Sequence, residues 1–542
     1  MAVAAVALVA AGVVFAVALT RPAPLTIRNV RIPVVDGPQG NQHVVLDASF
    51  FLPPGGGKVP AVLLAHGFGE TKDAVRPQAE DLARAGFAVL TWSARGFGAS
   101  TGQIGLDSPD DEVKDVEQLV TWLARQPRVL LDRPGDPRVG ITGASYGGGI
   151  ALLAAAYDHR IDAVAAESTW NNLATALFPN GAGGGPANGV FKRQWAGLLF
   201  SQGSAGFGAT AQGSAPGQAA GLGQADGSAP GAGLGQGGGA GQVLPPGAAG
   251  RSALCGRFQP QICAIYQQVG ATGQPTPQAI SLLLRSSPAS VAGRMRAPTM
   301  LIQGENDSLF GLDQADANYR ALRRNGAPVD MVWFAGGHDG GDQETGRVES
   351  LTTQWLRRWL EPGHPPASAG TGQPSYAVTR VLGIDPSSGQ TSLGIATSSS
   401  YPGLSGTRRT LVRLAGPRQV VVSPAGGAPA SISVFPGLGS LRPAGLAFDM
   451  PGQSAAFASA PLSRPVQLTG SPTVRVAVSG APEVTLFAKI YDVDQAGNAT
   501  LPNQLVSPVR ITGAQAGRVV TIALPAIDYD FSAGHQIRLV LT

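Results

Sequence analysis

Apolar and polar positions follow two different patterns along the chain. Between residues 25 and 360, short apolar runs typical of buried strands alternate with stretches whose apolar positions have helical spacing. Strands that alternate with helices in this way predict an α/β fold with a mostly parallel, doubly wound sheet, whose ligands bind at the carboxyl ends of the strands. The expected strands are 25–34, 43–52, 59–65, 87–92, 138–142, 161–166, 299–303 and 329–334, and the expected helices are 110–126, 146–157, 313–325 and 348–360.

An insertion, 171–297, interrupts the alternation and divides the α/β domain into 25–170 and 298–362. Its ends carry helical patterns at 191–200, 261–269 and 277–285, which we expect to form a small cap over the strand ends. Its glycine-rich middle, 201–250, has too few apolar side chains to order itself and predicts a mobile loop.

Two cysteines, Cys255 and Cys263, lie close together in this insertion. In an extracytoplasmic protein they would form a local disulfide, and in a reducing compartment they would be ordinary buried thiols.

The pattern changes again near residue 370, after which no helical spacing is found. Alternating apolar positions at 473–478, 484–490 and 537–541 indicate strands with one buried face. Frequent glycine and proline breaks between them favour a β-sandwich or jelly roll over 370–542.

The amino-terminal segment has a pattern of its own. Residues 2–19 are all apolar or glycine, and the first charged residue is Arg21. As a helix this run would rise about 27 Å, close to the ~30 Å thickness of a bilayer core. We therefore expect 1–21 to be a membrane anchor, with a signal peptide as the alternative. Either reading predicts a membrane-anchored or secreted protein, and we expect its catalytic domain to be extracytoplasmic, although the single Arg21 does not determine the orientation of an anchor.

Composition narrows the function classes. Of 542 residues 43 % are hydrophobic, which excludes global disorder. The net charge of +4 is not gathered in any cluster of lysine and arginine, so nucleic acid is not an expected partner. Two cysteines and six histidines exclude a zinc ribbon or an iron–sulfur protein, and no metal or other cofactor is expected.

The strongest chemical motif is Gly143-Ala144-Ser145-Tyr146-Gly147, between an expected strand and an expected helix. This is the G-x-S-x-G pattern of a nucleophile elbow, in which a tight turn lifts the serine hydroxyl above the sheet. The glycines are needed because side chains at their positions would collide with neighbouring elements. The alternative is a tight glycine turn whose serine caps the helix.

A serine nucleophile needs a base and an acid that orients the base, and in this fold they follow in the order Ser, Asp/Glu, His. His338 stands in a glycine-rich loop directly after an expected strand, and Asp307 follows the strand before it. Glu305 is the local rival for the acid, while Asp339 and Asp342 lie too near the histidine in sequence. The expected triad is Ser145, Asp307 and His338.

Other residues are expected around this triad. The oxyanion hole should use the backbone N–H of Tyr146 and that of Phe68, in the glycine-flanked loop after strand 59–65. Glu167 and Trp170 follow the strand after the nucleophile helix, where they could line a substrate pocket or belong to the core. Arg95 is expected to brace the region rather than to touch substrate.

Five short motifs occur in this part of the chain, namely His66-Gly67, Arg95-Gly96-x-Gly98-x-Ser100, Gly143-x-Ser145-Tyr146-Gly147-Gly148, Gly304-x-x-Asp307 and Gly337-His338. Residues 25–360 thereby resemble the X-prolyl dipeptidyl-peptidase and CocE/NonD acyl-esterase group of α/β-hydrolases. The order of catalytic domain, helical cap and carboxyl-terminal jelly roll is similar too. The resemblance implies the same triad. Relatives often carry a tyrosine in the oxyanion loop, and Phe68 stands in that loop here.

The resulting hypothesis is a serine hydrolase that forms an acyl-enzyme on Ser145. Its substrate would be a small-molecule acyl ester, or a peptide from which a dipeptide ending in proline is removed. An aminopeptidase needs an acidic group for the free α-amine, and Glu167 is one candidate. The alternative function is a membrane-tethered, non-catalytic binding or scaffold protein that uses the hydrolase fold for recognition. The sequence assigns no oligomeric state.

Overall fold

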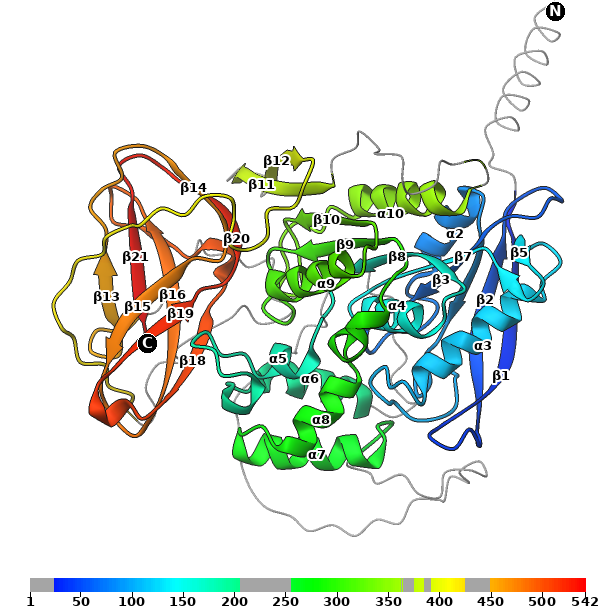
Figure 1. Ribbon diagram of the computed structural model, residues 1–542, viewed down its shortest axis with the longest axis horizontal. Coiled ribbons are helices and arrows are strands. Elements are labelled where there is room, and N and C mark those ends of the chain that lie inside the picture. Colours follow the sequence, from blue (N-terminus) through cyan, green and yellow to red (C-terminus); the bar gives the residue numbers. More distant parts are fainter. Residues whose placement is uncertain (1–23, 205–254, 362, 364–374, 385–390, 425–448) are drawn as a thin grey trace, which may run out of the picture.

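The computed structural model describes residues 24–204, 255–361, 363, 375–384, 391–424 and 449–542. Its α/β domain is built on one ten-stranded sheet in the order β1-β2-β4-β3-β7-β8-β9-β10-β11-β12 (Figure 1). Neighbouring strands are parallel from β4 to β11 and antiparallel at both ends. The strands are β1 (Thr26–Asp36), β2 (Gln42–Leu52), β3 (Ala61–Ala65), β4 (Ala88–Trp92), β7 (Val139–Ala144), β8 (Ile161–Glu167), β9 (Thr299–Gly304), β10 (Val329–Phe334), β11 (Tyr376–Ile384) and β12 (Thr391–Ser398).

Helices cover both faces of this sheet. On one face, α3 (Glu112–Ala124), α4 (Tyr146–Tyr157) and α9 (Leu312–Arg324) share a hydrophobic core with the strands. On the other face, α2 (Arg76–Arg84) and α10 (Thr345–Leu360) pack together against the sheet. Helix α4 is apolar all round and almost completely buried, as a helix at the centre of such a domain must be. A small hairpin, β5 (Leu131–Arg133) and β6 (Asp136–Pro137), lies beside the sheet.

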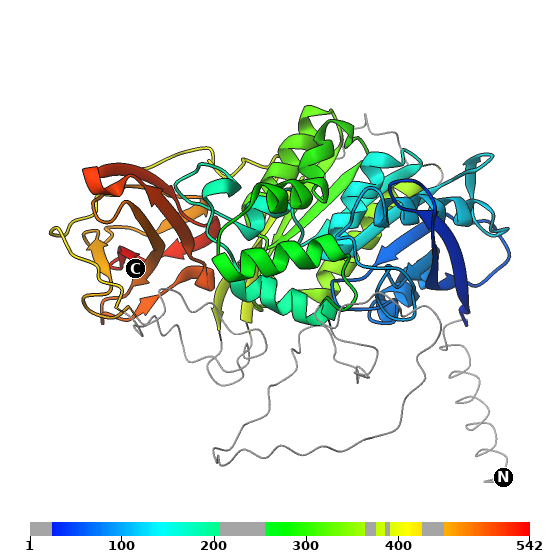
Figure 2. The same ribbon diagram turned by 90° about the horizontal axis from the view of Figure 1, so that it is seen from below.

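The described part of the insertion contains four α-helices, which lie below the sheet in Figure 1 and in front of it in the view from below (Figure 2). They are α5 (Leu173–Leu177), α6 (Arg193–Ser204), α7 (Pro260–Thr272) and α8 (Pro277–Arg285). Their apolar side chains share one core with Tyr146, Trp170 and Phe310 of the α/β domain, so they form a cap over the strand ends. Cys255 and Cys263 form a disulfide at the start of α7. The predicted mobile loop, 201–250, lies almost wholly outside the described residues.

In the carboxyl-terminal domain, the described residues form only strands, short helical turns and loops. A five-stranded sheet and two strand pairs enclose a hydrophobic core of their own. The sheet consists of β13 (Ala455–Ala458), β16 (Glu483–Val493), β17 (Ala499–Thr500), β18 (Ser507–Thr512) and β21 (Gln536–Leu541), and the pairs are β14 (Val466–Gly470) with β20 (Ile527–Phe531) and β15 (Thr473–Val478) with β19 (Arg518–Ala523).

The predicted domain boundary at residue 370 is wrong. Strand β11 pairs with β10, and β12 pairs with β11. Both strands extend the sheet of the α/β domain, although their sequence pattern resembles the β region that follows. Tyr401 also packs in the core of the α/β domain, against Trp333 and Tyr376. The α/β domain therefore continues past residue 400, because alternating apolar positions identify a strand without saying which sheet it joins.

The expected anchor or signal segment, 1–21, lies outside the described residues. Among the helices that the structure describes, none combines the length and the apolar character that a membrane crossing requires.

Candidate active site

Ser145 lies at the junction between β7 and α4, in a backbone conformation that few side chains adopt. Its φ is 55° and its ψ is −115°, and such a positive φ in a non-glycine residue is strained. The two flanking glycines make the turn possible. A Cβ on Gly143 would lie 2.7 Å from the carbonyl oxygen of Ala65, and one on Gly147 only 2.5 Å from it. Strand β3 therefore fits against the turn only because both positions lack a side chain.

His338 and Asp307 come to Ser145 from two loops at the carboxyl ends of β9 and β10. The Ser145 hydroxyl lies 2.9 Å from His338 Nε2, and His338 Nδ1 lies 2.6 Å from Asp307 Oδ2. Asp307 is buried, and its other oxygen accepts hydrogen bonds from the backbone N–H groups of Leu309 and Phe310, at 3.0 and 2.7 Å. The structure thus brings the three expected residues into one connected line.

The charge on Asp307 determines how His338 titrates. Burial alone would favour the neutral imidazole, but the carboxylate of Asp307 and, more weakly, those of Asp339 and Glu167 raise the pKa of His338 above its usual value. An imidazole whose protonated form is stabilised in place is well suited to accept a proton from a neighbouring hydroxyl.

The other carboxylates that could have oriented His338 accept hydrogen bonds from other groups. Glu305 accepts a hydrogen bond from the backbone N–H of Asp528 in the β domain. Asp339 accepts from the N–H and the hydroxyl of Ser308, and Asp342 accepts from the N–H of Glu344. In the described residues, only Asp307 contacts His338 Nδ1 through a carboxylate.

The two residues that carry the expected oxyanion donors line the same cavity as Ser145. Tyr146 is the first residue of α4, where helical hydrogen bonding leaves the backbone N–H groups unpaired. Phe68, in the loop after β3, lines the same cavity as Ser145 and Tyr146 and places its ring edge-on against the Tyr146 ring. The buried His66 holds this loop: its Nε2 accepts from the N–H of Ala94 at 2.9 Å, and burial lowers its pKa to about 4, so it stays neutral.

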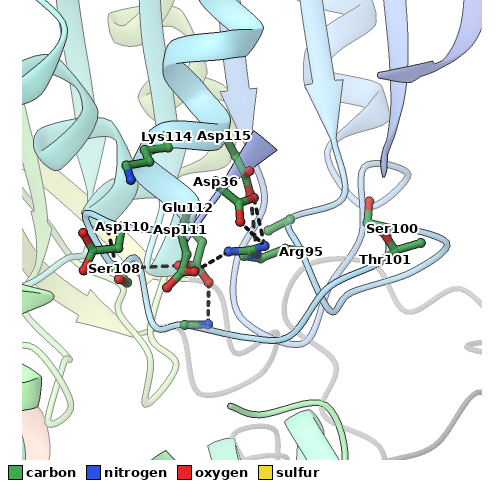
Figure 3. Close-up of polar contacts among 12 residues, drawn as sticks. Asp36, Arg95, Ser100, Thr101, Ser108, Asp110, Asp111, Glu112, Lys114 and Asp115 are labelled. Atoms are coloured by element: carbon green, nitrogen blue, oxygen red, sulfur yellow. Dashed lines mark hydrogen bonds and ion pairs between the residues drawn. The ribbon is translucent and has the colours of Figure 1, made fainter. Parts of the chain in front are cut away.

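Arg95 lies among several acidic side chains, as Figure 3 shows. It is almost fully buried and pairs with Asp36 at 2.8 Å, with Asp111 at 2.7 Å and with Asp115 at 3.7 Å. The neighbouring Glu112 accepts from two backbone N–H groups and from the hydroxyl of Tyr146 at 3.3 Å. Burial raises the pKa of Glu112 to about 7. This network fixes the Tyr146 side chain and thereby the first turn of α4, and it does not reach the triad.

Two residues of the insertion contact the loops that carry Asp307 and His338, and the sequence pattern did not predict either of them. Lys192 Nζ donates to the carbonyl oxygens of Ser308 and Leu309, at 2.5 and 2.9 Å, directly after Asp307. Trp195 Nε1 donates to the hydroxyl of Ser308 at 2.9 Å, and its ring stands edge-on to His338. These residues are more than 100 positions away from their partners, and no local motif marks them.

The two expected pocket residues differ in their placement. Trp170 is buried, donates from Nε1 to the carbonyl of Ser286 and lines the cavity above Ser145. Glu167 is not among the residues that line it. Its backbone carbonyl instead accepts from the N–H of Ser145. No cluster of His, Cys, Asp and Glu suited to a metal ion is found among the described residues.

Comparison with known families supplies the context for this geometry. Residues 39–340 match the model of the X-Pro dipeptidyl-peptidase (S15) family. The chain belongs to this family. Residues 445–542 of this S15 protein match the X-Pro dipeptidyl-peptidase C-terminal non-catalytic domain. The recognised resemblance is thereby confirmed, and so are the α/β-hydrolase fold, the all-β C-terminal domain and membership among hydrolases.

Curated relatives match part of this chain, and solved structures share its fold. An uncharacterized 31.7 kDa protein of Escherichia coli is 32 % identical over 120 residues, which are 22 % of this chain, and the match spans 40 % of that relative's length. An alpha-amino acid ester hydrolase shares the fold, with a TM-score of 0.62 at 14 % identity over 96 % of this chain and 89 % of that chain. A CocE/NonD family hydrolase from Staphylococcus aureus does so with a TM-score of 0.56 at 12 % identity, over the same shares.

Proposed function

We propose that this S15-family protein is a serine hydrolase that forms an acyl-enzyme on Ser145, acting on a small-molecule ester or on a peptide. The observation that carries the proposal is the line of hydrogen bonds from the Ser145 hydroxyl through His338 to the buried Asp307. A strained serine turn, a histidine and a carboxylate from three separate stretches have little reason to converge unless the serine reacts.

In the proposed reaction His338 Nε2 accepts the Ser145 proton as Oγ attacks the carbonyl carbon of the substrate. Asp307 keeps the proton of Nδ1 directed toward itself and stabilises the imidazolium that forms. The backbone N–H groups of Tyr146 and Phe68 would hold the developing oxyanion. His338 then gives its proton to the leaving group, and water, activated by the same histidine, releases the acyl group.

Covalent labelling with a fluorophosphonate probe tests the proposal. We expect labelling of the native protein, no labelling of Ser145→Ala, and a kcat for Ser145→Ala that is about 10⁴- to 10⁶-fold lower. Lack of labelling in a folded native protein would instead favour a non-catalytic binding protein. Near-full activity in Ser145→Ala would refute the assigned nucleophile.

A further inference from the structure

The cavity between Ser145 and the cap is lined almost entirely by apolar side chains. Its walls come from all four cap helices and from the α/β domain, and they include Leu173 of α5, Leu199 of α6, Ile265 of α7 and Leu282 of α8. Ser145 lies on this wall, so the cavity begins at the nucleophile. It is therefore in the right place to receive the group that becomes bonded to Ser145 Oγ.

The few polar groups on the wall already have partners or lie flat against other rings. The Tyr146 hydroxyl contacts Glu112 and the N–H of Asp107, and the Trp170 N–H donates to Ser286. The Tyr266 ring stacks on Phe200, with the ring centroids 3.8 Å apart. None of the described residues that line the cavity is charged. An ammonium group placed here would lose its water and gain no carboxylate, which is strongly unfavourable.

The size of the cavity limits the group that fills it. Its free volume is about 130 Å³. A dry apolar cavity of about 150 Å³, lined by Leu, Ile and Phe, takes up benzene, a molecule of six carbon atoms. A group of comparable size should fit here.

We propose that the cavity is the acyl site of this enzyme and selects an uncharged aliphatic acyl group of about six carbon atoms rather than an α-amino acyl group or a dipeptide with a free amino end. This inference rests on the proposed acyl-enzyme at Ser145 and names the class of acyl group that it carries. The substrate is thus an acyl ester: Oγ bonds to its acyl carbon, the alcohol leaves with the proton from His338, and water then releases a short-chain fatty acid.

The first experiment measures kcat/KM for p-nitrophenyl acetate, butyrate, hexanoate and octanoate. Each methylene that enters the cavity should raise kcat/KM about fourfold, so hexanoate should react about 250-fold faster than acetate, with no further gain at octanoate. The 2-aminohexanoyl ester, corrected for its spontaneous hydrolysis, should react about tenfold or more slowly than hexanoate. A flat chain-length profile, or a higher kcat/KM for Ala-Pro p-nitroanilide, would overturn the inference.

Two matched pairs of variants test whether this cavity determines the dependence of kcat/KM on acyl chain length. Leu282 lines the cavity and Leu284, on the same helix, is exposed. Leu282→Ala should raise the octanoate-to-hexanoate ratio about tenfold, since two more methylenes find room, and Leu284→Ala should leave it unchanged. Ala196→Phe should fill the cavity and lower the hexanoate-to-acetate ratio about tenfold, whereas Ala271→Phe, on the exposed face of α7, should not. Equal effects within both pairs would contradict the assigned site.

Fluorophosphonate labelling of each variant separates the two proposals. Labelled protein with a flat profile contradicts only the acyl-chain site, while unlabelled native protein contradicts the proposed function itself.

Discussion

At the scale of single residues, the site depends on close backbone contacts as much as on the reacting side chains. The strained conformation of Ser145 costs on the order of 1–3 kcal/mol and persists because its surroundings leave it no alternative. The carbonyl oxygen of Ala65 lies so close to the turn that only glycine fits at 143 and 147. The position of the Ser145 hydroxyl is therefore set by strand β3 as well as by its own strand.

Gly147→Ala tests this dependence. The added Cβ would meet the backbone of Ala65, which belongs to a central strand and cannot move aside, so the turn itself must shift. We expect kcat to fall about 10²-fold, since a displacement of ~1 Å can have that effect. Gly346→Ala is the control, because its Cβ would lie in open space on α10, and it should leave kcat unchanged. Equal kcat values for the two variants would contradict the proposed dependence.

Asp307→Asn tests the electrostatics of His338. The carboxylate raises the pKa of His338, and catalysis needs the neutral imidazole, so activity should fall as the pH falls through this raised pKa. Without the Asp307 carboxylate, burial is opposed only by the weaker effects of Asp339 and Glu167, so the acid limb of the kcat profile should move to lower pH. The kcat itself should fall about 10⁴-fold. Glu305→Gln is the control: the carboxyl of Glu305 faces the β domain, so this substitution should leave the acid limb of the kcat profile at the same pH.

The glycine-flanked Ser145, and the order of Asp307 and His338 after it, could be read from the sequence because each lies at the end of a regular apolar strand. The role of each in catalysis stays a prediction. Glu167 shows the limit of this reasoning: proximity in sequence to a strand end says nothing about which way a side chain points. Glu167 is not among the residues that line the cavity, so it does not offer its carboxylate there to the free α-amine of a peptide substrate.

At the scale of elements, the start of α6 holds the loop that carries the triad acid. Lys192 and Trp195 both bind the Ser308–Leu309 segment, and Trp195 also contacts His338. The periodic pattern predicted most helices within a few residues, but it omitted the short helices α2 and α5 and could not show that α6 reaches this loop. Contacts between distant segments follow from tertiary packing, which local periodicity does not encode.

Lys192→Met removes two hydrogen bonds to the backbone next to Asp307 while keeping a side chain of similar length. We expect kcat to fall about tenfold with little change in KM, because the acid loop loosens while the acyl cavity keeps its walls. Arg193→Met, which changes the neighbouring exposed side chain at the start of α6, should have no effect on either constant. A change confined to KM in Lys192→Met would assign the lysine to substrate binding instead.

At the scale of the whole molecule, several contacts attach the β domain to the rest of the described chain, and two of them involve the insertion and strand β11. The loop before α6 exchanges backbone hydrogen bonds with it, between Gly181 and the backbone of Pro508 and Ala523. Strand β11 supplies Arg380, whose Nε donates to the buried Asp528 at 2.8 Å. The alternating apolar positions predicted the strands of the β domain. They could not predict these attachment points, because contacts between distant segments depend on tertiary packing.

Arg380→Met tests the second attachment. It leaves the buried Asp528 without its cation, which should destabilise the β domain by about 1–3 kcal/mol, since Arg380 itself is partly exposed. We expect earlier melting of the β domain and its faster release by protease, both measured against Arg475→Met, a substitution of an exposed arginine on β15. Coincident melting curves for the two variants would show that Arg380 is dispensable for docking.

The extension of the sheet beyond β10 by β11 and β12 has a practical consequence for any attempt to divide the protein. A shortened chain that stops after α10 would leave the backbone donors and acceptors of β10 that face β11 unpaired. An exposed strand edge recruits other molecules and promotes aggregation. A chain that continues beyond Tyr401 would keep the natural edge at β12 and the aromatic packing around Trp333. Limited digestion followed by light scattering would show which of the two cuts yields a soluble fragment.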